Sequence, residues 1–299
     1  MNKKLLGNIL LTVTAMIWGT AFVFQRKGNE AIEPLTFTAS RMTLAAAAVG
    51  GVALFFRLKE RKDPSARTEE EERNSLRYSV MGGICCGAFL AAASIFQQIG
   101  MVTTTAGKAG FITAMYMLLV PVINFVFFGK KNSWLVWLAV GIGVAGMYLL
   151  CMTGGLRLTH GDTMVCICAF FFSGQILSFD YFVKRGKPIL ISAIQFAVCS
   201  AISWAAAFLL EQPEFGNILT AAIPILYCGI ISGGVGYTLQ IVAQEFTDPT
   251  IASLLMSLES VFALLAGAVI LHESMTTREL LGCIFMFTAI ILVQIPEKK

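Results

Sequence analysis

The sequence predicts an all-α polytopic membrane protein whose ten transmembrane helices form two inverted five-helix repeats. Three observations lead to this fold class: a composition that is 57% hydrophobic and 13% charged, long apolar runs that recur along the chain, and a skewed distribution of basic residues. Soluble proteins contain about 25% charged residues. A bilayer must therefore solvate the apolar surface of this chain.

Ten apolar segments are long enough to cross a bilayer, which takes about 20 residues of helix. In the first half they are 5–24, 34–56, 80–101, 105–128 and 134–152. In the second half they are 162–183, 188–210, 218–243, 249–271 and 277–295. The first run is longer than the apolar part of a secretory signal and no cleavage site follows it, so we interpret it as a span.

Several predicted helix ends have suitable local chemistry. Proline is tolerated at the first helical position, and three spans begin at such a residue: Pro34, Pro188 and Pro249. Asp162 and Asp248 are placed to cap helices. Thr276 and Glu279 have the spacing of a capping box before the last span.

Lys and Arg are concentrated in alternate loops. With the N-terminus inside, sixteen of the 22 basic residues lie in cytoplasmic segments and four lie in outer loops. Cytoplasmic loops carry such an excess in membrane proteins. We therefore expect a multi-pass protein of the plasma (inner) membrane with both termini cytoplasmic. The loop 57–79, which contains the acidic run 69–72, is expected to be a solvated linker.

A weak but ordered similarity relates the two halves of the chain. Arg41 follows Pro34 by seven residues, and Gln195 follows Pro188 by the same distance. Because five is an odd number, a repeated five-span unit must enter the membrane in the opposite direction the second time. Inverted repeats are typical of secondary transporters, whose substrate site lies between the halves near the midplane.

Three stretches of the chain together resemble the EamA family of the drug/metabolite transporter superfamily. The first is Trp18-Gly19 followed by Arg41, and the second is the run 103–113 followed by Pro121. The third comprises Gln244, Thr247, Pro249, Ala252, Leu258, Glu259, Val261, Ala263, Gly267 and Glu273. The resemblance covers nearly the whole chain.

The resemblance implies one EamA-like repeat over 1–152 and a second, inverted one over 153–299. It also implies ten helices around a central cavity and the export or exchange of a small metabolite, with amino acid-like solutes among the candidates. One position departs from the family pattern, since Ser260 stands where a proline often follows Leu-Glu. We therefore expect span nine to be straighter than span four, where Pro121 should kink the helix.

Charged residues inside predicted spans are the first candidates for function, because a charge at bilayer depth is costly. Arg41 could bind an anionic substrate group or pair with a carboxylate on a neighbouring helix. Glu259 could couple transport to protons, bind a cationic group, or hold helices together. Lys108, near the outer start of its span, is expected to extend its amine to the interface. Asp180 is expected to pair with Lys184.

Uncharged residues complete the candidate site. Side chains that could line a cavity or bond between helices are Trp18, Gln97, Gln98, Tyr116, Gln195, Tyr237 and Gln240. Candidate kink or hinge positions are Pro121, Gly233, Gly234 and Gly236. The glycines could soften the helix or allow close packing.

Other functional classes are less well supported. An intramembrane enzyme acting on a lipid-soluble substrate would need a nucleophile–base pair or metal ligands, but both histidines flank outer loops and no HExxH or GxSxG motif occurs. A small-solute channel would need a filter loop or a ring of charges. The eight cysteines contain no CxxC pair, and no nucleotide-binding motif occurs. We expect no cofactor, no metal and no nucleic-acid partner; the expected partners are a small-molecule substrate and the bilayer.

Overall fold

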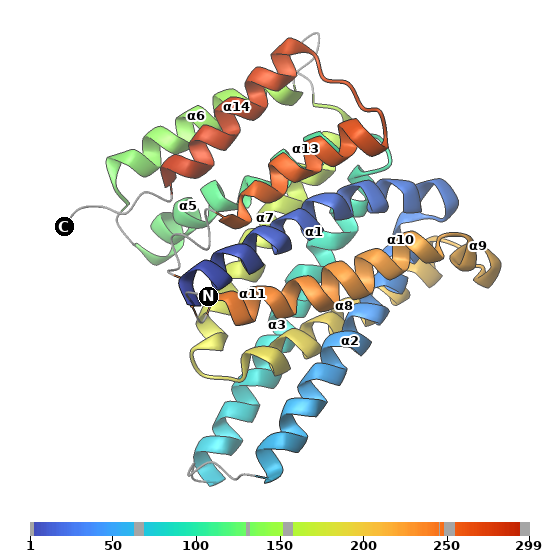
Figure 1. Cartoon of the computed structure of the whole chain (residues 1–299), viewed down its shortest axis with the longest axis vertical. Helices are drawn as coiled ribbons and strands as arrows, with labels where there is room; N and C mark the ends of the chain where they lie inside the picture. The colour runs from blue at the N-terminus through green and yellow to red at the C-terminus, as the bar shows by residue number, and fades with distance from the viewer. Residues whose placement is uncertain are drawn as a thin grey trace.

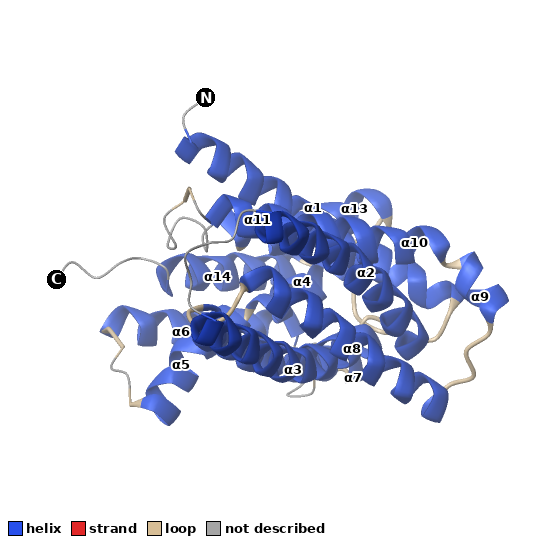
Figure 2. Cartoon of the chain, turned by 90° about the horizontal axis from the view of Figure 1, so that it is seen from below, coloured by secondary structure: helices blue, strands red, loops and turns tan. Residues whose placement is uncertain are grey.

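The computed structural model describes residues 3–62, 69–129, 132–151, 158–244, 246–247 and 255–293, and all regular secondary structure in these ranges is helical (Figures 1 and 2). The first half contains α1 (Lys3–Ala31), α2 (Pro34–Lys62), α3 (Glu69–Gly100), α4 (Ala106–Ala114), α5 (Tyr116–Phe128) and α6 (Trp134–Cys151). The second half contains α7 (His160–Val183), α8 (Pro188–Leu210), α9 (Phe215–Thr220), α10 (Ala222–Leu226), η1 (Tyr227–Gly236), α11 (Tyr237–Gln244), α13 (Leu258–Ile270) and α14 (Thr277–Val293).

Eight of the helical segments in the described residues are long and apolar enough to cross a membrane: Lys3–Ala31, Pro34–Leu58, Glu69–Gly100, Ala106–Phe128, Trp134–Cys151, His160–Val183, Pro188–Leu210 and Ala222–Gln240. Leu258–Ile270 is a shorter apolar helix. Large apolar side chains on the outside of the bundle, such as Leu209 at 82% exposure and Trp134 at 74%, would face lipid.

The helices pack as neighbours that are distant in sequence. α2 lies along α8, α3 contacts both α7 and α8, and α1 lies along α13. The helices α6 and α14 pack on each other and form a separate pair at the top of Figure 1. Small residues allow these close approaches, since a Cβ atom at Gly146 would lie 2.7 Å from the backbone nitrogen of Met286.

Local chemistry explains most helix ends. Pro34 and Pro188 are the first residues of α2 and α8, as predicted. Glu211 accepts the backbone N–H groups of Leu35 and Thr36 at 2.8 and 2.7 Å, which satisfies two donors at the start of α2. At α14, Thr276 and Glu279 form the predicted capping box.

The cap of α7 differs from the prediction. Thr159, and not Asp162, is the capping residue, since its hydroxyl accepts the backbone N–H of Asp162 at 3.1 Å. The carboxylate of Asp162 is buried and instead accepts a hydrogen bond from the Thr104 hydroxyl at 2.6 Å. The other predicted cap, Asp248 with Pro249, lies outside the described residues.

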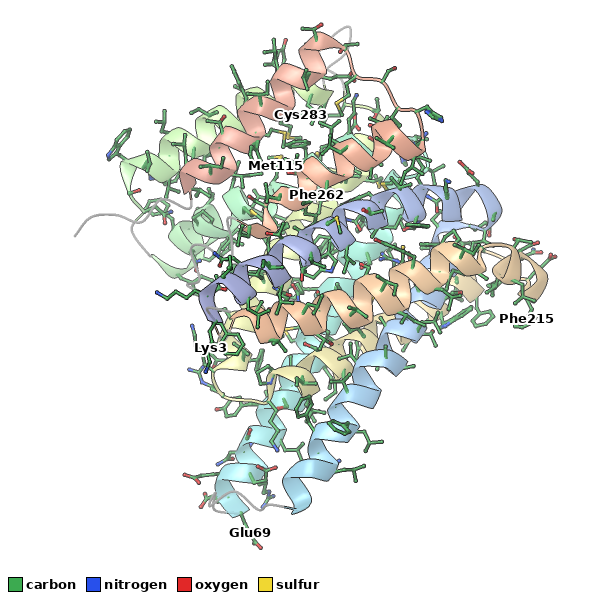
Figure 3. The ribbon with its side chains drawn as sticks, in the orientation of Figure 1. Lys3, Glu69, Met115, Phe215, Phe262 and Cys283 are labelled. Atoms are coloured by element: carbon green, nitrogen blue, oxygen red, sulfur yellow. The ribbon has the colours of Figure 1, made fainter. Side chains whose placement is uncertain are left out.

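The predicted linker 57–79 is mostly helical. α2 continues to Lys62, and the acidic residues Glu69 to Glu72 form the first turn of α3, where the helix dipole favours negative charge. The two helices project together beyond the rest of the bundle (Figure 1), with Glu69 labelled near the end of the projection in Figure 3. Lys187 anchors this projection through an ion pair of 2.7 Å with Glu72.

Two predicted spans are interrupted. Span four breaks at Met115, between α4 and α5, one residue before Tyr116 (Figure 3). In span nine the chain turns at Ser257, directly before α13. Span nine is therefore interrupted as well as span four, and Pro121 lies inside α5 rather than at the break. Both the N–H and the hydroxyl of Ser260 bond to the carbonyl oxygen of Ser257, at 3.3 and 2.9 Å, and this local pairing replaces a regular helical turn.

Span eight is divided more strongly. It comprises α9, α10, a ten-residue π-helix η1 and α11. A π-helix of this length is rare, and short π segments occur frequently at functional sites. Its glycines allow close packing against α2: Cβ atoms at Gly233 and Gly234 would lie 2.6 and 2.9 Å from the Cβ atoms of Ala45 and Ala48.

Candidate functional site

A cavity of about 600 Å³ lies among the helices. Residues of α1, α2, α3, α4, α5, α7, α8, η1, α11 and α13 line it, whereas the described residues of α6 and α14 do not. Spans four and nine both reach the cavity close to their interruptions. Tyr116 follows the break at Met115, Glu259 follows the turn at Ser257, and both residues line the cavity. A volume of this size accommodates a small organic molecule.

Aromatic side chains form one wall of the cavity. The Trp18 ring lies 5.3 Å from the Tyr237 ring, and the Phe196 ring lies 4.9 Å from Tyr237 in an edge-to-face arrangement, measured between centroids. The Trp18 indole N–H donates a hydrogen bond of 3.1 Å to the carbonyl oxygen of Ser232 in η1. The π-helix therefore helps to position the aromatic wall.

Arg41 lies on the cavity wall and is 8% exposed. Its Nε and Nη2 atoms have no hydrogen-bond partner, and no carboxylate lies within 4.0 Å of its side-chain nitrogens in the described part of the chain. The neighbouring groups that could carry charge are Cys199, Cys228 and Tyr237, which are ordinarily neutral at pH 7. Arg41 was predicted either to bind an anionic substrate group or to pair with a carboxylate on a neighbouring helix. The described residues supply no partner for the second role.

Glu259 lies in the first turn of α13, is half-buried, and faces the same cavity. The described residues provide neither an ion pair nor a hydrogen bond for its carboxylate. Arg41 and Glu259 thus line one cavity, and Asp180 lies at its exposed end. Tyr116 lines it as well, with its ring 6.4 Å from that of Phe172.

The other predicted residues divide into two groups. Gln240 and Gly233 line the cavity, and the Gln240 amide donates to the sulfur of Met256 at 3.3 Å. Gln98 and Gln195 are fully buried away from the cavity. Gln98 joins α3 to α1 through bonds to the carbonyl oxygen of Gln25 and the Asn29 side chain, so its contacts are structural.

Gln195 supports the cavity indirectly, since its side-chain oxygen accepts a hydrogen bond of 3.0 Å from Gln175, which does line the cavity. Gly234, Gly236 and Pro121 do not line it. A Cβ atom at Gly236 would lie 2.6 Å from the Trp18 indole nitrogen, so this glycine leaves space for the tryptophan.

Several cavity residues were not predicted. Gln25, Ser94, Thr113 and Gln175 line it, and the Gln97 amide, which was predicted, donates to Thr113 at 3.1 Å. Gln175 and Ser94 could have been predicted as cavity residues, because each is a polar residue within an apolar span. Gln25 follows the apolar part of span one, where a polar residue is ordinary, so its sequence position carried no such signal.

Polar contacts gather at the end of the bundle that the charge pattern predicts to face outward. Glu273 accepts the backbone N–H groups of Ala106 and Gly107 at 3.0 and 3.4 Å, which caps α4, and it lies 3.5 Å from Arg26. Arg26 also donates to the carbonyl oxygen of Thr104. These residues, which we call the end cluster, join α1 to α4 and to the segment after α13.

The end cluster continues on the α14 side. Lys108 forms an ion pair of 2.7 Å with Glu279, with both side chains 12% exposed. Its predicted extension to the membrane interface stays a prediction. At the opposite end of the cavity, Asp180 forms the predicted pair with Lys184 at 2.8 Å and is 61% exposed. The cavity therefore reaches the surface near Asp180.

Comparison with known proteins agrees with this architecture. The model of the EamA-like transporter family matches residues 5–152 and again residues 159–295. An uncharacterized transporter of Archaeoglobus fulgidus is 26% identical over 298 residues, covering 98% of this chain and 87% of that protein. A solved crystal structure with 16% identity superposes with a TM-score of 0.62 over 95% of both chains, which supports the fold alone.

Proposed function

The chain belongs to the EamA-like transporter family, and we propose that it is a secondary transporter that exports or exchanges a small metabolite by alternating access. It is a multi-pass membrane protein, and both the family and the name of its archaeal relative point to a transporter rather than an enzyme. The observation that carries the proposal is the cavity of about 600 Å³, in which Arg41 and Glu259 face one space without ion-pair partners among the described residues.

The asymmetry between the two ends of the cavity supports alternating access. The end cluster joins α1, α4 and the start of α14 at one end, while the other end reaches the exposed side chain of Asp180. A transporter that alternates must close one entrance while the other is open. In our proposal the closed entrance faces outward and the open one faces the cytoplasm, with both termini cytoplasmic in the plasma membrane.

We also propose that ten spans form two inverted five-span repeats. Exchanging spans one to five with spans six to ten preserves the main helix contacts. The pair α1–α13 becomes α7–α4, α3–α7 becomes η1–α1, and α3–α8 becomes η1–α2; all of these pairs are in contact. The pairs α2–α8, α4–α13 and α6–α14 map onto themselves, as expected for helices that meet across a two-fold axis.

The interrupted spans fit the same scheme. Span four breaks at Met115 and span nine turns at Ser257, and residues within two positions of each interruption, Tyr116 and Glu259, reach the cavity. Secondary transporters typically build their substrate sites from such discontinuous helices. Amino acid-like solutes remain candidates for the substrate.

The test is a ligand screen followed by transport. A metabolite library containing anionic, cationic and neutral compounds is screened for thermal stabilisation of the purified protein. Compounds that stabilise it are then measured for saturable counterflow into reconstituted vesicles. We expect at least one compound to show both effects, with single cysteines in the cavity reacting from each side of the membrane in turn. Stabilising compounds that never cross the vesicle membrane, or non-saturating flux typical of a channel, would contradict the proposal.

A further inference from the structure

Arg41 carries an inference about the chemistry of the substrate. The residue is more than nine-tenths buried, two of its side-chain nitrogens have no hydrogen-bond partner, and it lines the cavity. Inserting an arginine at bilayer depth is energetically costly. In the described part of the chain no acidic side chain offsets this cost, although most buried charges in proteins are paired.

The backbone at Arg41 is held closely. A Cβ atom at Gly229 of the π-helix would lie 2.7 Å from the Arg41 carbonyl oxygen, so α2 and η1 are in direct backbone contact beside the arginine. The same π-helix accepts the Trp18 hydrogen bond through Ser232. One rigid contact region therefore positions both the basic group and the aromatic wall of the cavity.

We propose that Arg41 binds the single acidic group of a small organic anion whose apolar body packs against Trp18, Phe196 and Tyr237. The proposal rests on the transporter function above and assigns a substrate class to its cavity. Guanidinium groups bind carboxylates through two parallel hydrogen bonds, and the buried Nε and Nη2 atoms of Arg41 have no other hydrogen-bond partner in the structure. Aromatic rings that line one wall suit the apolar body of the ligand.

Glu259 limits the charge of the ligand. Its carboxyl group faces the same cavity, and a second acidic group on the substrate would lie beside another acid in a poorly solvated space, where two like charges repel strongly. We therefore assign a monoanion rather than a dianion. Inorganic anions would satisfy Arg41 but would leave the aromatic wall unoccupied, so they should bind much more weakly.

The experiment compares 3-phenylpropionate with 3-phenylpropionamide, which has the same skeleton without the charge. Binding to the purified full-length protein is measured by thermal shift and calorimetry, with chloride and phosphate as inorganic controls. We expect the acid to bind at least tenfold more tightly than the amide. The preference should disappear in Arg41→Gln and persist in part in Arg41→Lys. The control Arg278→Gln, in α14 and away from the cavity lining, should keep it.

Stability without ligand provides a second readout. Because Arg41 has no structural partner among the described residues, Arg41→Gln should unfold at the same temperature as the unchanged protein or at a higher one. A clear loss of stability would show that the arginine is a structural ion-pair partner and would overturn the proposal. Equal binding of acid and amide, failure of both to bind, or equal stabilisation by chloride or phosphate would overturn it too.

The metabolite screen separates this inference from the transporter function. If neutral or cationic compounds stabilise the protein and are transported while no organic anion is, the function stands and the anion assignment fails. If no compound of any charge is transported, the function itself fails. If organic anions are transported equally well by Arg41→Gln, the assigned substrate class stands, but Arg41 is not the residue that binds the acidic group.

Discussion

The indole nitrogen of Trp18 in α1 lies 3.1 Å from the carbonyl oxygen of Ser232 in the π-helix. This hydrogen bond connects the first half of the chain to the second at the wall of the cavity. In a regular α-helix this carbonyl would bond to the N–H group four residues later. A π-helix alters that pairing, and the Ser232 carbonyl oxygen accepts the hydrogen bond of the tryptophan.

Trp18→Phe should retain the ring but lose this bond. We expect a loss of about 0.5–1.5 kcal/mol in unfolding free energy, together with weaker binding of any ligand that contacts the aromatic wall. Thermal unfolding and ligand titration of the purified protein measure both effects. Trp134→Phe is the matched control, since Trp134 is 74% exposed on the outside of the bundle. Equal effects of the two substitutions would contradict the role of the Ser232 contact.

Gly229→Ala should destabilise the protein, because the added methyl group would lie 2.7 Å from the Arg41 carbonyl oxygen and 2.6 Å from the Leu44 Cβ atom. The expected cost of forcing α2 and η1 apart is about 1–3 kcal/mol. At Gly141 in α6 a Cβ atom would contact nothing within 4 Å. Gly141→Ala should therefore be neutral or stabilising by up to about 1 kcal/mol. The stabilities of the two variants are compared by thermal unfolding in the same detergent. An equal loss of stability in Gly141→Ala and Gly229→Ala would refute the packing argument.

Glu273→Gln should weaken the end cluster, because it removes the charge that faces Arg26 and caps α4. We expect the cavity to become more accessible from the predicted outer side. A cysteine at Ser232 on a cysteine-free background should react faster with a membrane-impermeant thiol reagent added outside. Glu30→Gln, an exposed position near the same end of α1, is the control. Unchanged labelling in Glu273→Gln would show that the cluster does not close this entrance.

Glu259→Gln tests proton coupling. The described residues contain no bonding partner that this substitution would remove, so folding and membrane insertion should be unchanged. If Glu259 carries the coupling proton, vesicle transport measured at several pH values should lose its pH dependence, because the amide cannot titrate. Asp180→Asn, at the exposed end of the cavity, should leave that dependence in place. Lower thermal stability with unaltered pH dependence would instead assign Glu259 to holding helices together.

The predicted orientation is testable by labelling. A cysteine at Glu70 should react only with reagents that reach the cytoplasm, whereas a cysteine at Phe215, which is 75% exposed, should react from outside. Lys3, which is predicted to be cytoplasmic like position 70, lies at the opposite end of the bundle from Phe215 in Figure 3, so positions 70 and 215 should report on opposite sides of the membrane. Labelling of position 70 from outside intact cells would reverse the topology.

The sequence by itself determined the membrane class, the family and the positions of most helices, because apolar length and helix-end chemistry are local properties. Pro34, Pro188 and the pair Thr276–Glu279 each act within one turn of helix, and the structure has them where the sequence predicts. The sequence also identified Arg41 and Glu259 as candidate site residues. A charged side chain within an apolar run is costly in the membrane, and it can be recognised without coordinates.

Only the tertiary structure decided which polar residues meet. Gln98 and Gln240 look alike in sequence, but Gln98 bonds to α1 while Gln240 lines the cavity. Lys108 pairs with Glu279, 171 residues later, through the packing of distant segments. The glycines of the π-helix pack closely against α2. These contacts join residues remote in sequence, and local propensity carries no information about which of several polar side chains will face the same space.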